Sequence, residues 1–253
     1  MRFGKDRASA RGAGTGMRGT MGTQVRRKDE IYHAQWDWFS GYWHFSFDQY
    51  HDPENMRFGS LRVFNADTLV PGAVWPLHPH RDIEVITYCV EGEFQHSDNL
   101  GQDGVLYPGD VQHTTVGRGL WHSEINHSKE EPMTFIQVWV MPRVEGLPPS
   151  LEQRHVEPQE RLNKLLPLVS NTYPGALPIE QDAAAYTATV EPDIRVEHRL
   201  EPGYGAYVYL IAGGVRLNGQ EMAAGDAAKV LGEESVTVQG IQRSELFMVV
   251  VQV

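Results

Sequence analysis

Two short pairs of residues constrain the fold of this chain more than any other feature. His78 and His80 flank a proline, and His122 and Glu124 flank a serine, so each pair occupies positions i and i+2. On a β-strand such positions point to the same face. If the two strands face one another, three imidazoles and one carboxylate converge. That set of ligands suits a redox-capable first-row metal such as iron, copper or nickel.

The residues around the pairs favour this interpretation. Pro79 removes a backbone donor between the two histidines, which suits a strand end or an edge strand. Gly117 and Gly119 permit a close backbone approach just before the second pair. A single His-x-His is a weak signal, because a lone histidine is more often solvated or hydrogen-bonded than a ligand. Two same-face pairs in one β-rich region favour a metal site over that alternative.

Short apolar segments separated by glycine and proline turns run through the chain. In the first half they predict strands at residues 59–65, 84–90, 94–97, 105–107, 111–116 and 134–141. In the second half they predict strands at residues 185–190, 194–200, 206–212, 215–218, 235–238 and 246–253. Asn218-Gly219 is a strong hairpin signal. This pattern predicts an all-β fold of the double-sheet jelly-roll type.

The chain divides into three parts. Residues 1–28 are expected to form a disordered N-terminal tail, because the first 24 are rich in glycine and arginine and lack apolar periodicity. A transit peptide and an over-long gene start are the alternatives; a secretory signal is excluded by the missing apolar core. Residues 29–145 are expected to be the metal-binding domain. Residues 146–253 are expected to hold a proline-rich linker and a second domain.

The second half looks like a faded repeat of the first. Residues 88–94 are echoed by residues 209–215, and the Pro-Gly-Asp at 108–110 is echoed by the Ala-Gly-Asp at 224–226. Carrying these offsets to the four candidate ligands gives residues that do not form the same set. They are Arg199 and Glu201 for the first pair, and Val238 and Gly240 for the second. We therefore expect a second barrel without metal.

Composition excludes several classes of function. The formal net charge is −11, and an acidic surface repels phosphate backbones, so direct nucleic-acid binding is not expected. The sequence holds no apolar run long enough to cross a bilayer. Cys89 is the single cysteine, which excludes an internal disulfide and fits a reducing compartment. We expect a cytoplasmic protein whose oligomeric state the sequence leaves open.

A resemblance to a known family adds to this reading. The stretch HPHRDIEVITYCVEGEFQHSDNLG, followed by YPGDVQHTTVGRGLWHSE, resembles the pirin family of the cupin superfamily, and most closely its bacterial members of the quercetin 2,3-dioxygenase type. The likeness is good over residues 31–154 and loose elsewhere. It implies a bicupin, with two jelly-roll barrels in tandem. In the family, HPH and HSE supply the metal ligands, which implies His78, His80, His122 and Glu124 here.

The resemblance also bears on neighbouring residues. The usual cupin acid follows His-x-His after three or four residues, where Glu84 stands, whereas pirins take the carboxylate from HSE. Glu124 is therefore assigned as the ligand, and Glu84 as a candidate to contact a ligand from behind. His96 matches a family position and is another candidate to contact a ligand from behind, and Gln112 matches a family position that is expected to face the pocket. Fe(II) is the expected metal, one per chain, with Cu, Ni, Co, Mn and Zn as alternatives, since imidazole and carboxylate accept several metals.

The implied reaction is the oxidative opening of a quercetin-like flavonol by dioxygen, with release of carbon monoxide. Glu124 is expected to act as the general base on the flavonol 3-hydroxyl. Four apolar side chains are expected to wall a flat pocket: Phe45, Phe47, Trp75 and Leu77. The alternative function is an iron-binding regulator that binds a transcription factor or a metabolic enzyme. A metal-stabilised structural barrel ranks third.

Overall fold

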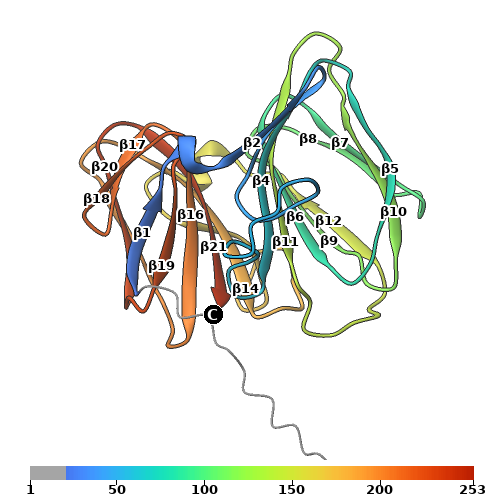
Figure 1. Ribbon diagram of the computed structural model, residues 1–253. Helices are drawn as coiled ribbons and strands as arrows, with labels where there is room; N and C mark the ends of the chain where they lie inside the picture. The colour runs from blue at the N-terminus through green and yellow to red at the C-terminus, as the bar shows by residue number, and fades with distance from the viewer. Residues whose placement is uncertain (1–20) are drawn as a thin grey trace, which may run out of the picture.

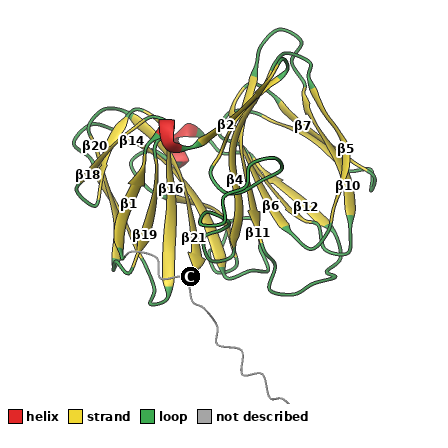
Figure 2. Ribbon diagram, viewed as in Figure 1, coloured by secondary structure: helices red, strands yellow, loops and turns green. Residues whose placement is uncertain are grey.

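The computed structural model describes residues 21–253 and consists almost entirely of β-strands (Figure 2). Four sheets pair into two β-sandwich barrels that lie side by side (Figure 1). Within the described residues, helical structure is limited to two short 3-10 turns, η1 (Lys28–Glu30) and η2 (Pro158–Glu160). The predicted all-β fold of two tandem jelly-roll barrels is therefore confirmed.

The first barrel packs a seven-stranded sheet against a four-stranded sheet. Its strands are β2 (Tyr32–Trp36), β3 (Phe39–Trp43), β4 (Leu61–Leu69), β5 (Val74–His80), β6 (Glu84–Glu91), β7 (Phe94–Asp98), β8 (Asp103–Leu106), β9 (Val111–Thr115), β10 (Leu120–Asn126), β11 (Met133–Val140) and β12 (Ser150–Arg154). The large sheet has the order β12-β9-β6-β11-β4-β3-β2, and the small sheet the order β5-β10-β7-β8.

The second barrel repeats this plan with a six-stranded and a four-stranded sheet. Its strands are β1 (Gly22–Arg26), β13 (Leu166–Ser170), β14 (Ala183–Val190), β15 (Arg195–Arg199), β16 (Tyr204–Ala212), β17 (Gly214–Leu217), β18 (Gln220–Ala223), β19 (Ala227–Leu231), β20 (Ser235–Gly240) and β21 (Ser244–Gln252). The large sheet has the order β1-β19-β16-β21-β14-β13, and the small sheet the order β15-β20-β17-β18.

Local sequence explains the elements that position the site. Along β10, residues at even positions are buried and those between them are more exposed, as the period of two requires. The expected hairpin at Asn218-Gly219 joins β17 to β18, and both residues have positive φ, 44° and 85°, as a type I′ turn demands. Gly117 has a φ of 52°, and a Cβ there would collide with the carbonyl of Leu147, so only glycine fits.

The large sheets of the two barrels share one apolar core. Phe64 of β4, Tyr207 of β16 and Phe247 of β21 belong to it and are almost wholly buried. The ring centroids of Phe64 and Tyr207 lie 5.2 Å apart, and those of Phe64 and Phe247 lie 6.1 Å apart. Aromatic side chains bury large apolar areas. The two barrels are therefore held together by a buried apolar core, as the two sheets of a single domain are.

Each barrel borrows a strand from the other half of the chain. β1 precedes every strand of the first barrel, but it pairs with β19 of the second, where Val25 lies opposite Ala228. β12 follows the proline-rich segment, but it pairs with β9 of the first barrel. The predicted domain boundary between residues 145 and 146 stays a prediction. β1 and β12 each pair with strands from the other side of that boundary.

The expected disordered tail is corrected in its last part. Residues 22–26 form β1, and η1 follows at once, so this stretch is ordered. The physical reason is that Val25 packs against the core of the second barrel while the backbone completes the edge of β19. The rest of the expected tail, residues 1–20, lies outside the described residues.

The β-ladders also correct the alignment of the repeat. Phe94 of β7 and Val215 of β17 are matched by the echoed segments 88–94 and 209–215, so His96 corresponds to Leu217. Glu124 lies opposite His96, and Val238 lies opposite Leu217. Val238 therefore stands at the place of Glu124, not of His122.

The same shift applies to the other three positions. His198 lies opposite Val236, as His78 lies opposite His122. The counterparts of His78, His80 and His122 are therefore His198, Leu200 and Val236. The predicted Arg199, Glu201 and Gly240 are wrong by one or two residues, because the connections between the echoed segments differ in length. That the second barrel holds no metal stays a prediction.

Candidate metal centre

The two predicted pairs lie on neighbouring strands of the small sheet of the first barrel. His78 of β5 lies opposite His122 of β10. The ring centroids are 4.7 Å apart for His78 and His80, 4.5 Å for His78 and His122, and 5.0 Å for His80 and His122. One nitrogen of each ring lies within 4.8 Å of the other two. In residues 21–253, this is the one group of three or more His, Cys, Asp or Glu side chains so arranged.

The nitrogens of these rings are available for a metal. His78 Nδ1 lies 2.7 Å from the carbonyl oxygen of Pro76 and donates to it, which leaves Nε2 as the free acceptor. His80 Nε2 and His122 Nε2 are buried and have no hydrogen-bond partner. A buried polar atom without a partner costs free energy unless another group satisfies it. The residues present therefore fit a divalent transition metal.

The electrostatics keep the imidazoles neutral, as ligation requires. Burial lowers the pKa of His78 below its ordinary value. Burial, with a smaller effect of His78, lowers the pKa of His80 to about 4. Burial, with smaller effects of the neighbouring histidines, lowers the pKa of His122 to about 2. Near neutral pH all three rings carry a lone pair for a metal.

Glu124 faces the same cavity but is not a member of the histidine group. Its carboxylate Oε1 accepts a hydrogen bond from Nε2 of Gln137 on β11. Burial raises the pKa of Glu124 to about 7, while the bond from Gln137 opposes the rise. Three of the four predicted ligands thus meet at one point, and the ligand role of Glu124 stays a prediction.

A cavity of about 70 Å³ lies beside the imidazoles. Two of the four expected wall residues line it, Phe47 and Trp75. Leu77 does not, because its side chain points away from the barrel interior and is 58% exposed. Phe45 does not either, because it is buried in the core between the barrels, 5.1 Å from the ring of Tyr207. The expectation is therefore wrong for Leu77 and Phe45.

Sequence reasoning missed the polar floor and one wall of this cavity. They are formed by Asn65 and Asp67 of β4 and by Gln137 and Trp139 of β11. Burial first, and then the nearby charge of Glu124, raises the pKa of Asp67 well above its ordinary range. The available signal is a polar residue between apolar ones, as Asn65 follows Phe64 in β4 and Gln137 follows Ile136 in β11. Both strands are mostly buried, and a buried polar residue needs a partner.

His96 lies behind the site, as expected, whereas Gln112 does not line the cavity, so the expectation that it faces the pocket is wrong. The ring centroid of His96 is 5.4 Å from that of His122, and its Nε2 lies 3.0 Å from Oδ2 of Asp98. Gln112 Nε2 lies 3.4 Å from Nδ1 of His96. Gln153 of the borrowed strand β12 donates to Gln112 Oε1 over 2.9 Å. These hydrogen bonds fix the imidazole of His96, which packs against His122.

Glu84 has a different role from the one expected. Its Oε1 accepts the backbone N–H of Glu180 over 2.8 Å, and its Oε2 accepts that of Gln181 over 3.0 Å. It also lies 3.6 Å from His113 on β9. The even residues of β6 face the second barrel, so Glu84 anchors the segment that leads into β14. The expectation that it supports a metal ligand is wrong.

Comparison with known sequences gives two matches along the chain. The pirin family model matches residues 24–140. The model of the quercetinase C-terminal cupin domain matches residues 168–250. No helix within residues 21–253 is long and apolar enough to pass through a membrane.

Relatives and solved structures agree with these matches. A pirin-like protein of Caulobacter vibrioides is 35% identical, over 87% of this chain and 96% of its own length. A quercetin 2,3-dioxygenase of Escherichia coli K12 is 30% identical, over 88% of this chain and 96% of its own length. The crystal structure of the bacterial pirin YhhW from Escherichia coli, in complex with nickel(II), has a TM-score of 0.86 at 28% identity and covers 91% of this chain and 99% of its own.

Proposed function

The chain belongs to the pirin family, and from that premise we propose that it is a metal-dependent dioxygenase that opens quercetin-like flavonols with release of carbon monoxide. The observation that supports this most strongly is that three imidazoles converge on one point, beside a cavity that two of them, His78 and His80, line together with the buried carboxyl group of Glu124. Relatives named quercetin 2,3-dioxygenase supply the substrate class. We also propose a cytoplasmic location, which rests on the single cysteine.

His78, His80 and His122 would hold the metal, and we propose Glu124 as the fourth ligand. Fe(II) is the metal we propose, at one per chain, with Cu, Ni, Co, Mn and Zn as alternatives. A bound metal would polarise the substrate's enol oxygen as a Lewis acid and bring dioxygen close to it. A solved relative carries nickel(II), so the alternatives belong in any assay.

Glu124 is the proposed base for the flavonol 3-hydroxyl. Burial brings the pKa of this carboxyl to about 7, closer to that of a phenolic hydroxyl than an ordinary carboxyl is. Gln137 holds Oε1, so Oε2 is the oxygen that would both ligate the metal and accept the proton. Because a nearby cation lowers the proton affinity of a carboxylate, this contact with the metal would have to loosen as the substrate binds. The hydroxyl O–H bond breaks, the proton passes to Oε2, and it returns to the depside product when that leaves. One flavonol and one dioxygen yield one depside and one carbon monoxide.

The walls of the cavity would orient the substrate and exclude water. The indole of Trp139 lies 4.7 Å from the ring of His80, and Phe47 packs edge-on against it at 5.3 Å. An enclosed space of about 70 Å³ is too small for a whole flavonol. Only the reacting edge of the flavonol would enter, while the remaining rings would lie against the indoles at the cavity mouth.

The test is an assay of metal-loaded protein with quercetin in the presence of dioxygen. The protein is stripped of metal and reloaded separately with iron, copper, nickel, cobalt and manganese. We expect flavonol loss, followed by its absorbance, together with carbon monoxide in an equal amount. Flavonol loss without carbon monoxide, or no loss with any of the five metals, would refute the proposed reaction.

A second candidate function, an iron-dependent regulator that binds a partner protein, is favoured by one surface feature. Leu77 is 58% exposed and Trp121 is 48% exposed, and both point outward from the strands that carry the histidines. Trp121 lies opposite Pro79 in the ladder. Large exposed apolar side chains next to one another are characteristic of interaction sites. Failure of the flavonol assay with all five metals would make this the leading candidate.

A further inference from the structure

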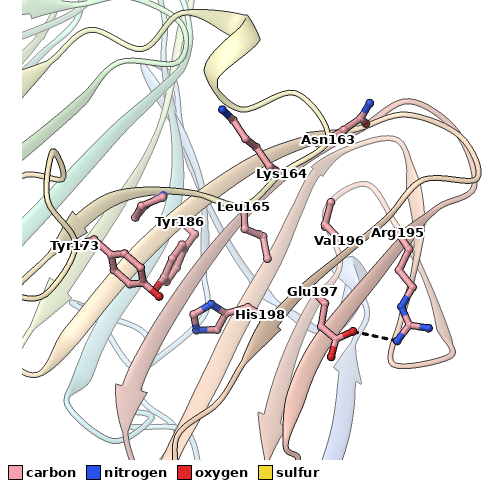
Figure 3. A pocket seen from close by; sticks show the side chains of 10 residues that line it. Asn163, Lys164, Leu165, Tyr173, Tyr186, Arg195, Val196, Glu197 and His198 are labelled. Atoms are coloured by element: carbon pink, nitrogen blue, oxygen red, sulfur yellow. Dashed lines mark hydrogen bonds and ion pairs between the residues drawn. The ribbon is translucent and has the colours of Figure 1, made fainter.

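The second barrel has a cavity of its own, about 380 Å³ in volume (Figure 3). Tyr186 of β14 and His198 of β15 line it, together with Tyr173 from the loop before β14. A volume of this size falls in the range of small-molecule pockets.

This cavity is the counterpart of the metal cavity in the first barrel. Asn65 lies opposite Gln137 in the first barrel, and Tyr186 lies opposite Met248 in the second. Gln137 lies opposite Thr87, and Met248 lies opposite Val208, which are matched residues of the echoed strands. Tyr186 therefore replaces Asn65, and His198 replaces His78. The second barrel has lost most of the ligand set but keeps a pocket in the same position.

The lining suits a flat aromatic ring. The rings of Tyr173 and Tyr186 meet at 81°, with centroids 5.9 Å apart, and their hydroxyl groups meet at one end of the pocket (Figure 3). The imidazole of His198 lies 4.7 Å from the ring of Tyr186 at 52°. Tyr186 is only 3% exposed, so a ring bound in the cavity would pack mainly against Tyr173 and His198. Burial lowers the pKa of His198, so its ring is neutral and offers one donor and one acceptor.

The rim of the cavity carries an excess of positive charge. Arg195 and Glu197 form an ion pair of 3.2 Å at one side. Lys164 stands at the other side, with its ammonium group directed away from the three rings (Figure 3), and its acidic neighbour Glu160 is already paired with Arg154 at 2.8 Å. The chain as a whole has a formal charge of −11. A cationic rim on an acidic protein selects for an anion at this point.

We propose that this cavity is a metal-free binding site for a small phenolic carboxylate of the hydroxybenzoate class. The aromatic ring would lie against Tyr173 and His198, with Tyr186 behind them. The carboxylate would point towards the rim, where the flexible side chain of Lys164 would turn towards it. The phenolic hydroxyl would reach the tyrosine hydroxyls and the imidazole at the inner end. The site does not depend on the reaction proposed for the first barrel.

The test is calorimetric titration with 4-hydroxybenzoate. The His78→Ala/His122→Ala double variant serves as the background, so that the first barrel cannot hold the probe through a metal. We expect one binding site per chain. Lys164→Met and His198→Leu should each weaken binding on the order of tenfold, as expected for a lost charged or hydrogen-bonding contact. Lys129→Met, which removes an exposed lysine of the first barrel, is the matched control and should leave binding unchanged.

4-Hydroxybenzyl alcohol, which lacks the carboxylate, should bind on the order of tenfold more weakly than the acid. Absence of binding up to about 10 mM would overturn the proposal. So would binding that Lys164→Met and His198→Leu leave intact. Lys164 is exposed, so its variant should fold normally even if His198→Leu does not.

Discussion

The side-chain amide of Gln137 donates a hydrogen bond to Oε1 of Glu124, joining the large and the small sheet of the first barrel across the cavity. Trp139 Nε1 donates in turn to Oε1 of Gln137 over 3.0 Å, which fixes the orientation of the amide. Within the described residues, Gln137 is the sole hydrogen-bond partner of this carboxylate. The position of the proposed base is therefore set by two residues of β11.

Gln137→Met should reduce turnover through the position of Glu124. The thioether keeps the volume but cannot donate, so the carboxylate loses its fixed orientation. We expect kcat to fall on the order of tenfold with little change in KM, because orientation matters most in the transition state. Gln159→Met, at an exposed position in η2, is the control. Steady-state kinetics with quercetin measure both, and an unchanged kcat would refute this role of Gln137.

Glu124→Gln should cost more, because it removes the basic oxygen itself. Loss of a general base typically lowers the rate by about a hundred- to ten-thousand-fold. The matched control is Glu130→Gln, which removes an exposed carboxylate from the loop after β10. Circular dichroism should show that both variants remain folded. If Glu124→Gln turns over flavonol at the wild-type rate, Glu124 is not the base.

The double variant His78→Ala/His122→Ala should hold no metal, whereas the wild type should hold about one metal ion per chain. Two of the three imidazoles are lost, and single ligands on a strand bind divalent metals weakly. Elemental analysis after dialysis gives the stoichiometry. His33→Ala, on β2 outside the cavity, is the control and should keep its metal. Stoichiometric metal in the double variant would reveal another site.

His44 should make stability depend on pH. It is fully buried between the barrels, its Nδ1 lies 2.8 Å from the Tyr207 hydroxyl, and burial, with Arg26, lowers its pKa to about 3. Below an ordinary pKa of about 6.5 the unfolded chain binds the proton more readily, so stability falls as the pH falls from there. Between pH 7 and pH 5 this histidine should cost about 2 kcal/mol.

Guanidinium unfolding at the two pH values tests this expectation. His44→Phe cannot take the proton, so its loss of stability between pH 7 and pH 5 should be smaller than that of the wild type by about 2 kcal/mol. Tyr207→Phe keeps the imidazole and should retain the wild-type decline. Equal declines in the wild type and His44→Phe would contradict the prediction.

Val25→Pro should destabilise the second barrel, although residue 25 precedes the first. Proline removes a backbone donor from β1, and Val25 packs against the core of that barrel. We expect a loss of about 2–3 kcal/mol in the free energy of unfolding. Val144→Pro, in an exposed connection, is the control and should change it by less than about 0.5 kcal/mol. Equal effects would show that β1 contributes nothing specific.

The period of two along a strand was sufficient to predict the metal-binding face. One residue separates His78 from His80, and one residue separates His122 from Glu124, so each pair shares one face of its strand. In the structure this face points into the barrel. The same period could have excluded Leu77, which flanks His78. The period alone would put Trp75 on the outer face, with Leu77. It lines the cavity because a bulge between β5 and β10 pairs Glu124 with Trp75 and shifts the alternation. A bulge of this kind leaves no clear mark in the sequence.

Contacts between distant segments account for most of the remaining differences. The sequence predicted two barrels, but it did not show that residues 22–26 complete the second one, since a lone strand edge carries no residue pattern of its own. Glu84 is buried against the backbone of Glu180 and Gln181, about a hundred residues away, and its local sequence resembles that of a metal ligand. Its role depends on the packing of the barrels, which propensity and spacing do not encode.

The exchange of β1 and β12 has a consequence for how such a chain is inherited. A gene fragment for residues 29–145 would leave β9 without β12 on one side, and a fragment for residues 146–253 would leave β19 without β1 on one side. Each product would expose an unpaired strand edge, which is a template for aggregation. A crossover in the proline-rich connection would thus yield two defective halves, so the two barrels are expected to pass between genomes as one indivisible unit.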